Sequence, residues 1–278
     1  MKKVIFSFFI PFSFYAQSVF QGKLTEMDST QVIPFAAIGI VNKAIGALSN
    51  EQGHFIFESK LVTPNDSIQI SAIGYKTRIF SVREFENHMY KTIQLEKLAN
   101  ELDEIIIESK KLKTEILGAK KFTINNCTGF VKGSKNWQGS ETASLAGNKE
   151  GRHVYIQEFS FYIIQNKYTD SLQFRLMFYE ASPKKWPRWR TFLRRPILFK
   201  IGIEKGLYTL DLRKYQLNTE HDFFISIECL EEEIDISKFC YSGANAQPAF
   251  VRPAAYEWWN KTRGGGAELQ VKVAYPAK

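Results

Sequence analysis

Residues 66–76, with the sequence DSIQISAIGYK, say most about how this chain folds. Apolar and polar side chains alternate from Ile68 to Ala72, and this period of two predicts a β-strand with one buried face. A Pro-Asn turn signal precedes the strand. Gly74 follows it and marks a bend or the close approach of another backbone segment. A strand of this kind needs neighbours in a sheet, and the flanking sequence supplies them.

Short β-type runs, separated by turn residues, lie on both sides of this strand. They make roughly seven strands in about 80 residues, and turn signals at such regular spacing predict a small Greek-key sandwich. The aromatic content of 14% also favours β structure, because aromatic side chains fit a pleated, half-buried surface. The predicted strands are residues 19–24, 35–41, 45–48, 54–58, 67–73, 77–82 and 91–95.

Several residues of this block have predicted structural roles. The polar residues 49–53 lie between two strands and predict a hairpin, with Gly53 at a positive φ. Tyr75 is expected to be a structural ring with an anchored hydroxyl group. The core is expected to contain Phe35, Ile38, Phe55, Ile68 and Ile70.

Five pieces of sequence, in a fixed order and spacing, point to a known family. They are FQGKL at 20–24, IPFAAIGI at 33–40, GALSNEQGHF at 46–55, residues 66–76 and LDEIII at 102–107. With these pieces the first part of the chain resembles the carboxypeptidase regulatory-like domain family. The resemblance implies a transthyretin-like, or prealbumin-like, β-sandwich over residues 17–109. It also implies an exported protein, since the family is abundant among exported proteins of Bacteroidetes-type bacteria.

The sequence argues against the catalysis for which the family is named. In the carboxypeptidases this sandwich accompanies a separate catalytic domain, which needs His and carboxylate ligands to hold zinc. Here the four histidines are far apart and no His-Glu-x-x-His motif occurs. A Gly-x-Ser-x-Gly elbow, a phosphate-binding glycine loop and a paired-cysteine metal site are absent from the sequence as well. We therefore expect no enzymatic activity, no catalytic residue, no metal and no cofactor.

The N-terminus has the features of an export signal. Lys2 and Lys3 are followed by the apolar residues 4–15 and by Ala16, a small residue suited to cleavage. We expect residues 1–16 to be a signal peptide and the mature chain to be exported, to the periplasm or to the outer membrane and cell surface. No later apolar run has the roughly 20 residues that a membrane helix needs, so no span is expected in the mature chain.

The remaining sequence predicts a linker and a second β-domain. Residues 110–121 are rich in lysine and are the expected linker. Residues 122–278 contain recurring β-type runs and no long amphipathic helix, which favours a second β-sandwich of jelly-roll type. Residues 105–107 form a β-prone stretch that can pair with a sheet edge, either of this protein or of another.

Three cysteines allow at most one intramolecular bridge. Cys229 and Cys240 are close enough in sequence to pair across a turn. The alternative is that Cys127, Cys229 and Cys240 are all buried small apolar residues without a bridge.

Positive charge is concentrated in one segment of the chain. The formal net charge is +8, and residues 181–203 contain Lys and Arg but no Asp or Glu. Two tryptophans lie among these cations, in what we expect to be an ordered surface loop between two strands. The candidate ligand-binding residues there are Trp186, Arg188, Trp189, Arg190, Arg194 and Arg195.

A second candidate is the adjacent pair Trp258 and Trp259. Neighbouring side chains of a strand point to opposite faces, so one ring should be buried and the other exposed. An exposed flat ring can stack on a sugar or contact another protein.

Rings among cations suit a limited set of ligands. Anionic glycans, phosphorylated lipid headgroups and acidic protein surfaces are attracted to such a loop. The alternative is a solvated loop whose rings fill the end of the sandwich. We predict a non-enzymatic, exported cell-envelope protein that acts as a binding or interaction module, with an envelope protein or a glycan as its partner and no nucleic acid. The alternative function is that of a carbohydrate-binding accessory protein in a polysaccharide-utilisation system. No sequence feature indicates the oligomeric state.

Overall fold

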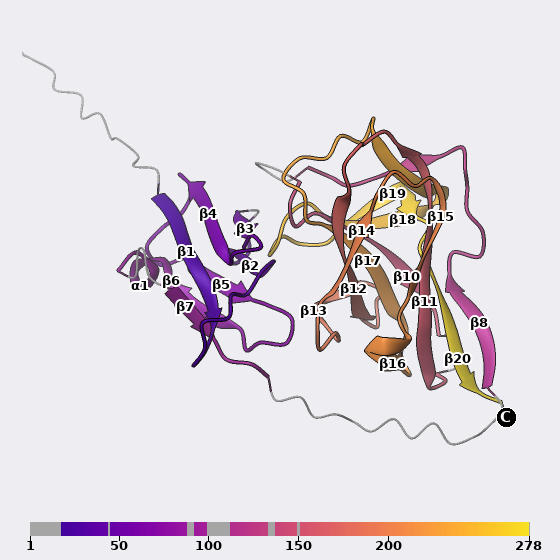
Figure 1. Cartoon of the computed structure of the whole chain (residues 1–278), viewed down its shortest axis with the longest axis horizontal. Helices are drawn as coiled ribbons and strands as arrows, with labels where there is room; N and C mark the ends of the chain where they lie inside the picture. Colours follow the sequence, from indigo (N-terminus) through magenta and orange to yellow (C-terminus); the bar gives the residue numbers. More distant parts are fainter. Residues whose placement is uncertain are drawn as a thin grey trace, which may run out of the picture.

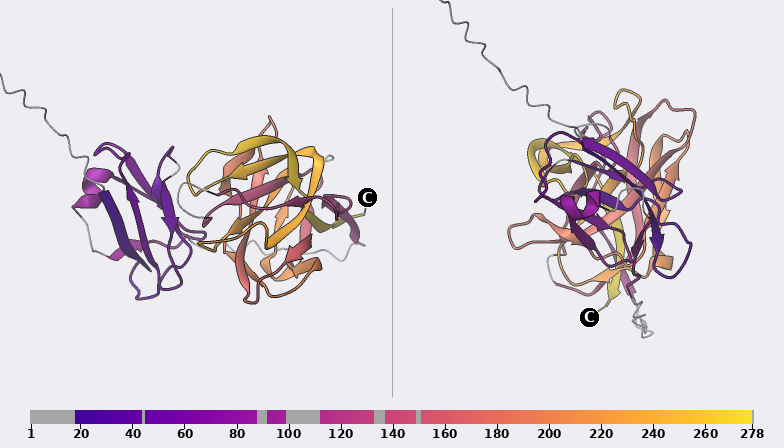
Figure 2. Two further views of the ribbon diagram at one scale, coloured as in Figure 1. Left: turned by 90° about the horizontal axis from the view of Figure 1, so that it is seen from above. Right: turned by 90° about the vertical axis from the view of Figure 1, so that its left-hand side faces the viewer.

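The chain folds into two β-domains. The computed structural model describes residues 18–43, 45–87, 92–98, 112–132, 137–148 and 151–277. Strands make up 54% of the structure and helices 3%, so the all-β prediction is confirmed. Figures 1 and 2 show the N-terminal domain beside the second domain, which begins at residue 112. The predicted signal peptide and the β-prone residues 105–107 lie outside the described residues.

The N-terminal domain consists of two sheets that face each other. The alternating strands predicted from the sequence are all present, and each turns one apolar row inward. A short helix, α1 (Val82–Glu86), follows the last strand of one sheet and is capped by Ser81 and Glu84. One sheet has the order β4 (His54–Ser59), β1 (Ser18–Glu26), β7 (Thr92–Leu95); the other has the order β3 (Gly46–Leu48), β2 (Ala37–Ile40), β5 (Ser67–Ser71), β6 (Arg78–Ser81).

The predicted structural roles in this domain are confirmed with one exception. All five predicted core residues are buried, although Phe35 packs at the boundary with the second domain and not in the central cluster. The Tyr75 hydroxyl donates a hydrogen bond to Glu26 over 2.5 Å. Gly74 has φ of 88°, and a Cβ there would lie 2.8 Å from the carbonyl oxygen of Arg194 in the second domain.

The exception is the hairpin predicted at residues 49–53. Gly53 does have a positive φ of 77°, and the Asn50 side chain accepts hydrogen bonds from the backbone of Gln52 and His54. However, β3 pairs with β2 and β4 pairs with β1, so this turn crosses from one sheet to the other. Turn residues mark where the chain reverses direction; they do not decide whether the two flanking strands pair with each other.

The second domain is formed by two antiparallel sheets joined through the long strand β18. The first residues of β18 pair with β11, and its last residues pair with β10 and β19. The elements of the second domain are β8 (Leu112–Gly118), β9 (Cys127–Thr128), β10 (Glu141–Ala146), β11 (Val154–Asn166), β12 (Leu172–Ala181), β13 (Pro187–Thr191), β14 (Ile197–Ile201), β15 (Gly206–Asp211), the 3-10 turn η1 (Arg213–Tyr215), β16 (Asn218–Thr219), β17 (Phe223–Cys229), β18 (Phe239–Arg252), β19 (Asn260–Ala267) and β20 (Gln270–Pro276). The jelly-roll type stays a prediction.

The predicted linker, residues 110–121, overlaps this second domain. Residues 112–118 form β8, which pairs with β20 along its whole length. Lys113 and Glu115 lie on this edge strand, and Leu117 is its buried residue. Charged residues are common on edge strands and give such a strand the composition of a linker.

Strand β17 lies deep inside the second domain, and all its residues are buried. Because side chains alternate, Phe174 and Phe178 of β12 point to the main aromatic core, whereas Arg175 and Tyr179 point to the opposite face. That opposite face is buried as well, since Arg175 is only 6% exposed. It therefore needs a cover, which comes partly from the N-terminal domain.

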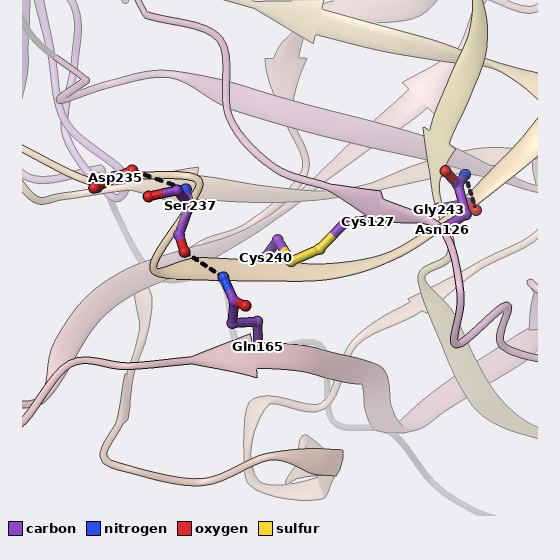
Figure 3. The surroundings of a disulfide bond; sticks show 7 residues. All are labelled: Asn126, Cys127, Gln165, Asp235, Ser237, Cys240 and Gly243. Carbon is purple, nitrogen blue, oxygen red and sulfur yellow. Dashed lines mark hydrogen bonds between the residues drawn. A yellow bond between two sulfur atoms is a disulfide. The ribbon is translucent and has the colours of Figure 1, made fainter.

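A disulfide bridge joins Cys127 of β9 to Cys240 of β18, with their Cα atoms 5.7 Å apart (Figure 3). The pairing of Cys229 with Cys240 that the sequence suggested does not occur. Cys229 points into the core, where burial raises the pKa of its thiol to about 12. The two bridged residues are 113 positions apart in the chain but neighbours in the sheet.

Removing the bridge should destabilise the protein considerably. A bridge that closes a loop of this length restricts the unfolded chain, and we expect the Cys127→Ser, Cys240→Ser variant to lose about 2–5 kcal/mol of unfolding free energy. Denaturant titration measures this loss. Cys229→Ala is the control and should lose less. Equal stability of the oxidised and the reduced wild type would contradict the bridge.

Candidate functional site

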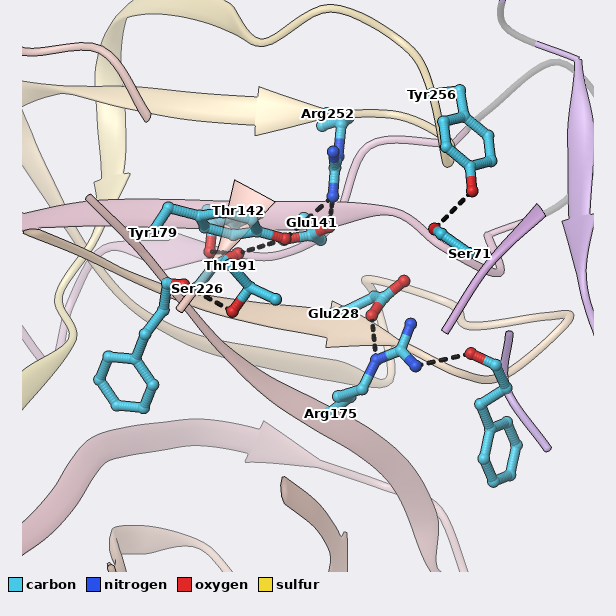
Figure 4. Close-up of polar contacts among 12 residues, drawn as sticks. Ser71, Glu141, Thr142, Arg175, Tyr179, Thr191, Ser226, Glu228, Arg252 and Tyr256 are labelled. Atoms are coloured by element: carbon cyan, nitrogen blue, oxygen red, sulfur yellow. Dashed lines mark hydrogen bonds and ion pairs between the residues drawn. The ribbon is translucent and has the colours of Figure 1, made fainter. Parts of the chain in front are cut away.

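Four charged residues form a row across four adjacent strands of the second domain. Arg175 of β12 lies opposite Glu228 of β17, which lies opposite Glu141 of β10. Glu141 in turn lies opposite Arg252 of β18. The row therefore has one Arg at each end and two Glu residues in the middle, all on the covered face described above (Figure 4).

Hydrogen bonds connect the members of this charged row. The Arg175 Nε donates to Glu228 over 2.5 Å, and Arg252 forms an ion pair with Glu141. The Tyr179 hydroxyl donates to Glu141 over 2.8 Å, and the Ser226 hydroxyl donates to the same carboxylate oxygen over 2.9 Å. Each charge thus has an opposite charge or a hydroxyl group beside it, as burial of charge requires.

Burial dominates the electrostatics of the charged row. The loss of water raises the pKa of the Glu141 carboxyl, and the neighbouring Arg252 opposes this rise. Burial and the nearby Glu141 raise the pKa of the Tyr179 phenol well above its ordinary value. None of these groups is exposed enough to meet a ligand directly, because all are less than 10% exposed.

The N-terminal domain covers the Arg175 end of the row. The Nη1 of Arg175 donates a hydrogen bond to the carbonyl oxygen of Phe35 over 2.6 Å. Beside this contact lies a small apolar cluster from both domains, consisting of Phe35, Leu48, Leu230 and Ala255. The two domains therefore share a packed interface.

Tryptophans cover the other end of the row. Trp259 is 7% exposed; its ring lies 4.9 Å from the Arg252 guanidinium and 5.6 Å from the Tyr179 ring. Its neighbour Trp258 is 55% exposed and meets the ring of Trp189 edge to face at 4.8 Å. The prediction that one ring of the pair is buried and the other exposed is confirmed.

Three of the candidate tryptophans form an exposed group. Trp186 is 38% exposed and meets Phe250 of β18 at 5.3 Å, and Trp189 is 42% exposed. Together with Trp258 they lie over the face that carries the charged row, and we call Trp186, Trp189 and Trp258 the tryptophan surface. Strand β13, the turn before it and the segment 253–259 carry these residues, and the two segments are about seventy positions apart in sequence.

The basic segment is not the simple loop that the sequence predicted. Residues 182–186 form a tight turn in which the Ser182 hydroxyl accepts a hydrogen bond from the Trp186 backbone, and β13 then pairs with β12. A bend follows, after which β14 pairs with the other half of β12. Charged and aromatic residues on an exposed edge strand look like a loop in sequence.

The cations of this segment separate into two groups in space. Arg188 and Arg190 are exposed on β13, on either side of Trp189 in sequence, and Arg188 lies 3.7 Å from Glu180. Arg195 instead turns to the Tyr215 ring at 4.9 Å, and Arg194 lies at the contact with Gly74. Lys185 forms an ion pair with Asp222. Glu180 and Asp222 therefore offset part of the positive charge that the sequence concentrated here.

Lys261 of β19 adds a cation that the sequence prediction missed. Its Nζ lies 5.7 Å from the Phe250 ring, next to Trp186. The members of the charged row were missed as well. Their signal was present, because Arg175 and Glu228 are single charges inside otherwise apolar runs, and a buried charge needs a partner.

A groove of about 580 Å³ lies elsewhere, between the two domains. Its floor is the β4-β1-β7 sheet, and its walls come from residues 47–50 of the N-terminal domain and from Gln138 and Glu232 of the second domain. Phe55 is buried, so the groove offers hydrogen-bonding groups without an exposed Phe, Tyr or Trp ring. Polar lining residues include Gln21, Lys23, His54, Gln138 and Glu232.

Among the described residues no group of three or more His, Cys, Asp or Glu side chains is arranged to hold a metal ion. Within the same ranges no helix has the length and apolar character needed to cross a membrane.

The fold of the first block agrees with a comparison with known families. The model of the CarboxypepD_reg-like domain matches residues 20–107. This part of the chain is a CarboxypepD_reg-like domain. The match spans β1 to β7 and ends before the second domain, so the charged row and the tryptophan surface lie outside the CarboxypepD_reg-like domain.

Other comparisons give only distant similarities. No curated protein matches the chain. A structure of infectious bursal disease virus, Gx strain, is 10% identical over 94% of this chain and 60% of that chain, with a TM-score of 0.25. The T13 IBDV viral particle is 9% identical over 94% of this chain and 58% of that chain, with a TM-score of 0.24. A structure of carbohydrate-binding modules from the β-sandwich superfamily is 9% identical over 94% and 96%, with a TM-score of 0.14. This chain thus spans less than two thirds of the viral chains, and TM-scores this low carry no argument about function.

The charged row generates a stability prediction. Arg175→Met leaves Glu228 buried without its partner, and we expect a loss of about 3–5 kcal/mol in unfolding free energy by denaturant titration. Adding Glu228→Leu should restore most of the loss, because buried ion pairs can be replaced by apolar residues. Arg213→Met, which breaks the exposed pair with Asp211, is the matched control and should unfold like the wild type. Equal effects of the two single variants would contradict the account.

Proposed function

We propose that this protein is a non-enzymatic, exported cell-envelope protein whose second domain binds an anionic polysaccharide. The observation that carries the proposal is the tryptophan surface, in which exposed rings come from two segments of the chain about seventy residues apart. Trp186, Trp189 and Trp258 are between 38% and 55% exposed. Large aromatic groups rarely gather on a surface without a binding partner.

The chemistry of this surface suits sugar rings. An indole ring presents a flat apolar face and an edge that carries an N–H donor, which matches the apolar face and the hydroxyl groups of a sugar. The rings of Trp189 and Trp258 are fixed against each other edge to face. Fixed rings lose little conformational freedom on binding, and this favours affinity.

The charges around the rings favour an anionic ligand. Arg188 and Arg190 are the sequence neighbours of Trp189 on β13, and the Lys261 Nζ lies 5.7 Å from the Phe250 ring that Trp186 contacts. No ion-pair partner of Arg190 or Lys261 occurs among the described residues. Cations in such a position attract carboxylate or sulfate groups, and the attraction weakens with salt. A linear polymer of uronic acids combines sugar rings with one negative charge per unit.

Two features support an exported location. The first residues have the composition of a signal peptide. The Cys127–Cys240 bridge adds a second argument, since structural disulfides persist in the periplasm and at cell surfaces and are rare in the reducing cytosol. Both features suit the periplasm and the outer surface equally.

An envelope protein is the second candidate partner. Trp and Arg are enriched at the centres of protein interfaces, so the same surface suits a protein with an acidic patch. Strand β13 also lies at the edge of its sheet, where another strand can add. The two candidates differ in what competes for the surface: free polysaccharide competes in one case and has no effect in the other.

The binding test uses the full chain and polygalacturonate, a polymer of uronic acids. We expect the wild type to bind it at low salt and to bind neutral dextran less well, as measured by isothermal titration calorimetry. Trp189→Ala with Trp258→Ala should weaken binding at least about tenfold, because the loss of one good ring contact is worth about 1.4 kcal/mol. Higher salt should weaken wild-type binding.

The matched control replaces two exposed apolar residues away from this surface, Ile203→Ala with Ile236→Ala. This control should bind like the wild type. Absence of wild-type binding to any polysaccharide, or equal binding by the tryptophan variant, would contradict the proposal. If the protein instead co-purified with an envelope protein whose binding the tryptophan variant lost, the second candidate would replace the first.

A further inference from the structure

We propose that the CarboxypepD_reg-like domain positions the tryptophan surface, and that Tyr256 is the residue through which it does so. Tyr256 belongs to the second domain, in the same segment as Trp258 and Trp259. The inference deepens the proposed function, on which it rests. It gives the N-terminal domain a role in binding although none of its residues belongs to the tryptophan surface.

Tyr256 is anchored in the CarboxypepD_reg-like domain by two hydrogen bonds. Its hydroxyl group donates to the carbonyl oxygen of Ala37 over 3.0 Å. The same oxygen lies 2.5 Å from the Ser71 hydroxyl, which donates to it (Figure 4). Ala37 and Ser71 are directly paired on β2 and β5, so the acceptor and the donor are held by one rigid sheet.

The Tyr256 ring packs against Gly39 in strand β2 of the N-terminal domain. A Cβ at Gly39 would lie 2.6 Å from the Cδ2 of this ring, so the absence of a side chain at Gly39 makes room for Tyr256. Tyr256 also has a φ of 62°, in the left-handed region that residues other than glycine rarely adopt. Such a conformation persists where surrounding contacts hold it, and here those contacts come from the other domain.

Tyr256, the anchor, lies two residues before Trp258, one of the three exposed rings of the tryptophan surface. Segment 253–259 leaves β18 after Arg252, reaches the N-terminal domain at Tyr256 and returns over the charged row at Trp259. Trp258 lies between these two anchors and contacts Trp189. The backbone position of Trp258 is therefore set on one side by the interface between the domains.

The CarboxypepD_reg-like domain also touches the chain that follows β13. The Arg194 carbonyl lies against Gly74, and Leu198 packs with the interface cluster that contains Phe35. Both segments that carry exposed tryptophans, β13 and residues 253–259, are thus followed or interrupted by a contact with the same domain. A ligand that needs both rings in register depends on this domain for their spacing.

The test changes the anchor and reads the position of Trp258. Tyr256→Phe keeps the ring and removes the hydroxyl that joins the two domains. In full-length protein labelled with 5-fluorotryptophan, we expect the ¹⁹F resonance of Trp258, assigned by Trp258→Phe, to shift or broaden while that of the half-buried Trp137 stays unchanged. Affinity for polygalacturonate should fall about threefold to tenfold, although Tyr256 is not part of the tryptophan surface.

Two further variants complete the design. Tyr208→Phe is the matched control: the Tyr208 hydroxyl lies in another part of the second domain and donates to the Lys200 carbonyl. Its removal should change neither the Trp258 resonance nor the affinity for polygalacturonate. Ser71→Ala is a milder change, made within the CarboxypepD_reg-like domain, that removes one of the two hydrogen bonds of the Tyr256 hydroxyl. It should move the Trp258 resonance in the same direction as Tyr256→Phe. If Tyr256→Phe does not fold, Ser71→Ala still tests whether the contact with Tyr256 positions Trp258. An unchanged Trp258 resonance in both anchor variants, or a changed resonance with unchanged affinity, would overturn the inference. If the wild type did not bind polygalacturonate, the proposed function would fail, while the ¹⁹F spectra would still decide whether Tyr256 positions Trp258.

Discussion

The buried row of Arg175, Glu228, Glu141 and Arg252 constrains the rest of the second domain. Charges on a sheet face cannot be left against apolar side chains without partners, and this row satisfies them with cross-strand ion pairs and with hydroxyl groups. A face of this kind also has to be closed from above. The CarboxypepD_reg-like domain closes one end through the Phe35 carbonyl, and Trp259 closes the other.

The segment that covers the charged row, residues 253–259, also carries part of the proposed binding surface. Segment 253–259 has to cross from β18 to β19 over the buried charges, and in doing so it contacts the N-terminal domain at Tyr256. Its outward residue, Trp258, meets Trp189 on the edge strand β13. The exposed rings are therefore a consequence of how the charged face is covered, and the domain interface and the proposed binding surface share one segment of chain.

Much of the N-terminal domain could be predicted from sequence because its signals are local. Alternation from Ile68 to Ala72 and the turn residues around it gave the strands, and Tyr75 has the anchored hydroxyl that was expected. What the sequence could not predict depends on distant pairing. The turn at 49–53 joins two sheets, Cys127 pairs with Cys240 across 113 residues, and Tyr256 has no local feature that indicates its partners in the other domain.

The candidate site follows the same division. The tryptophans could be identified individually, but edge strand β13 looked like a loop, and only the fold brings Trp189 to Trp258 and separates Arg195 from them.

The central claim is that β13 and segment 253–259 form one ligand-binding surface. Amide hydrogen exchange of the full-length wild type, with and without polygalacturonate, tests it most directly. The account predicts slower exchange in residues 187–191 and 253–260 when the polymer is bound, and unchanged exchange in β8 and β20. Protection confined to the interdomain groove around Gln21 and His54, or no protection anywhere, would contradict it.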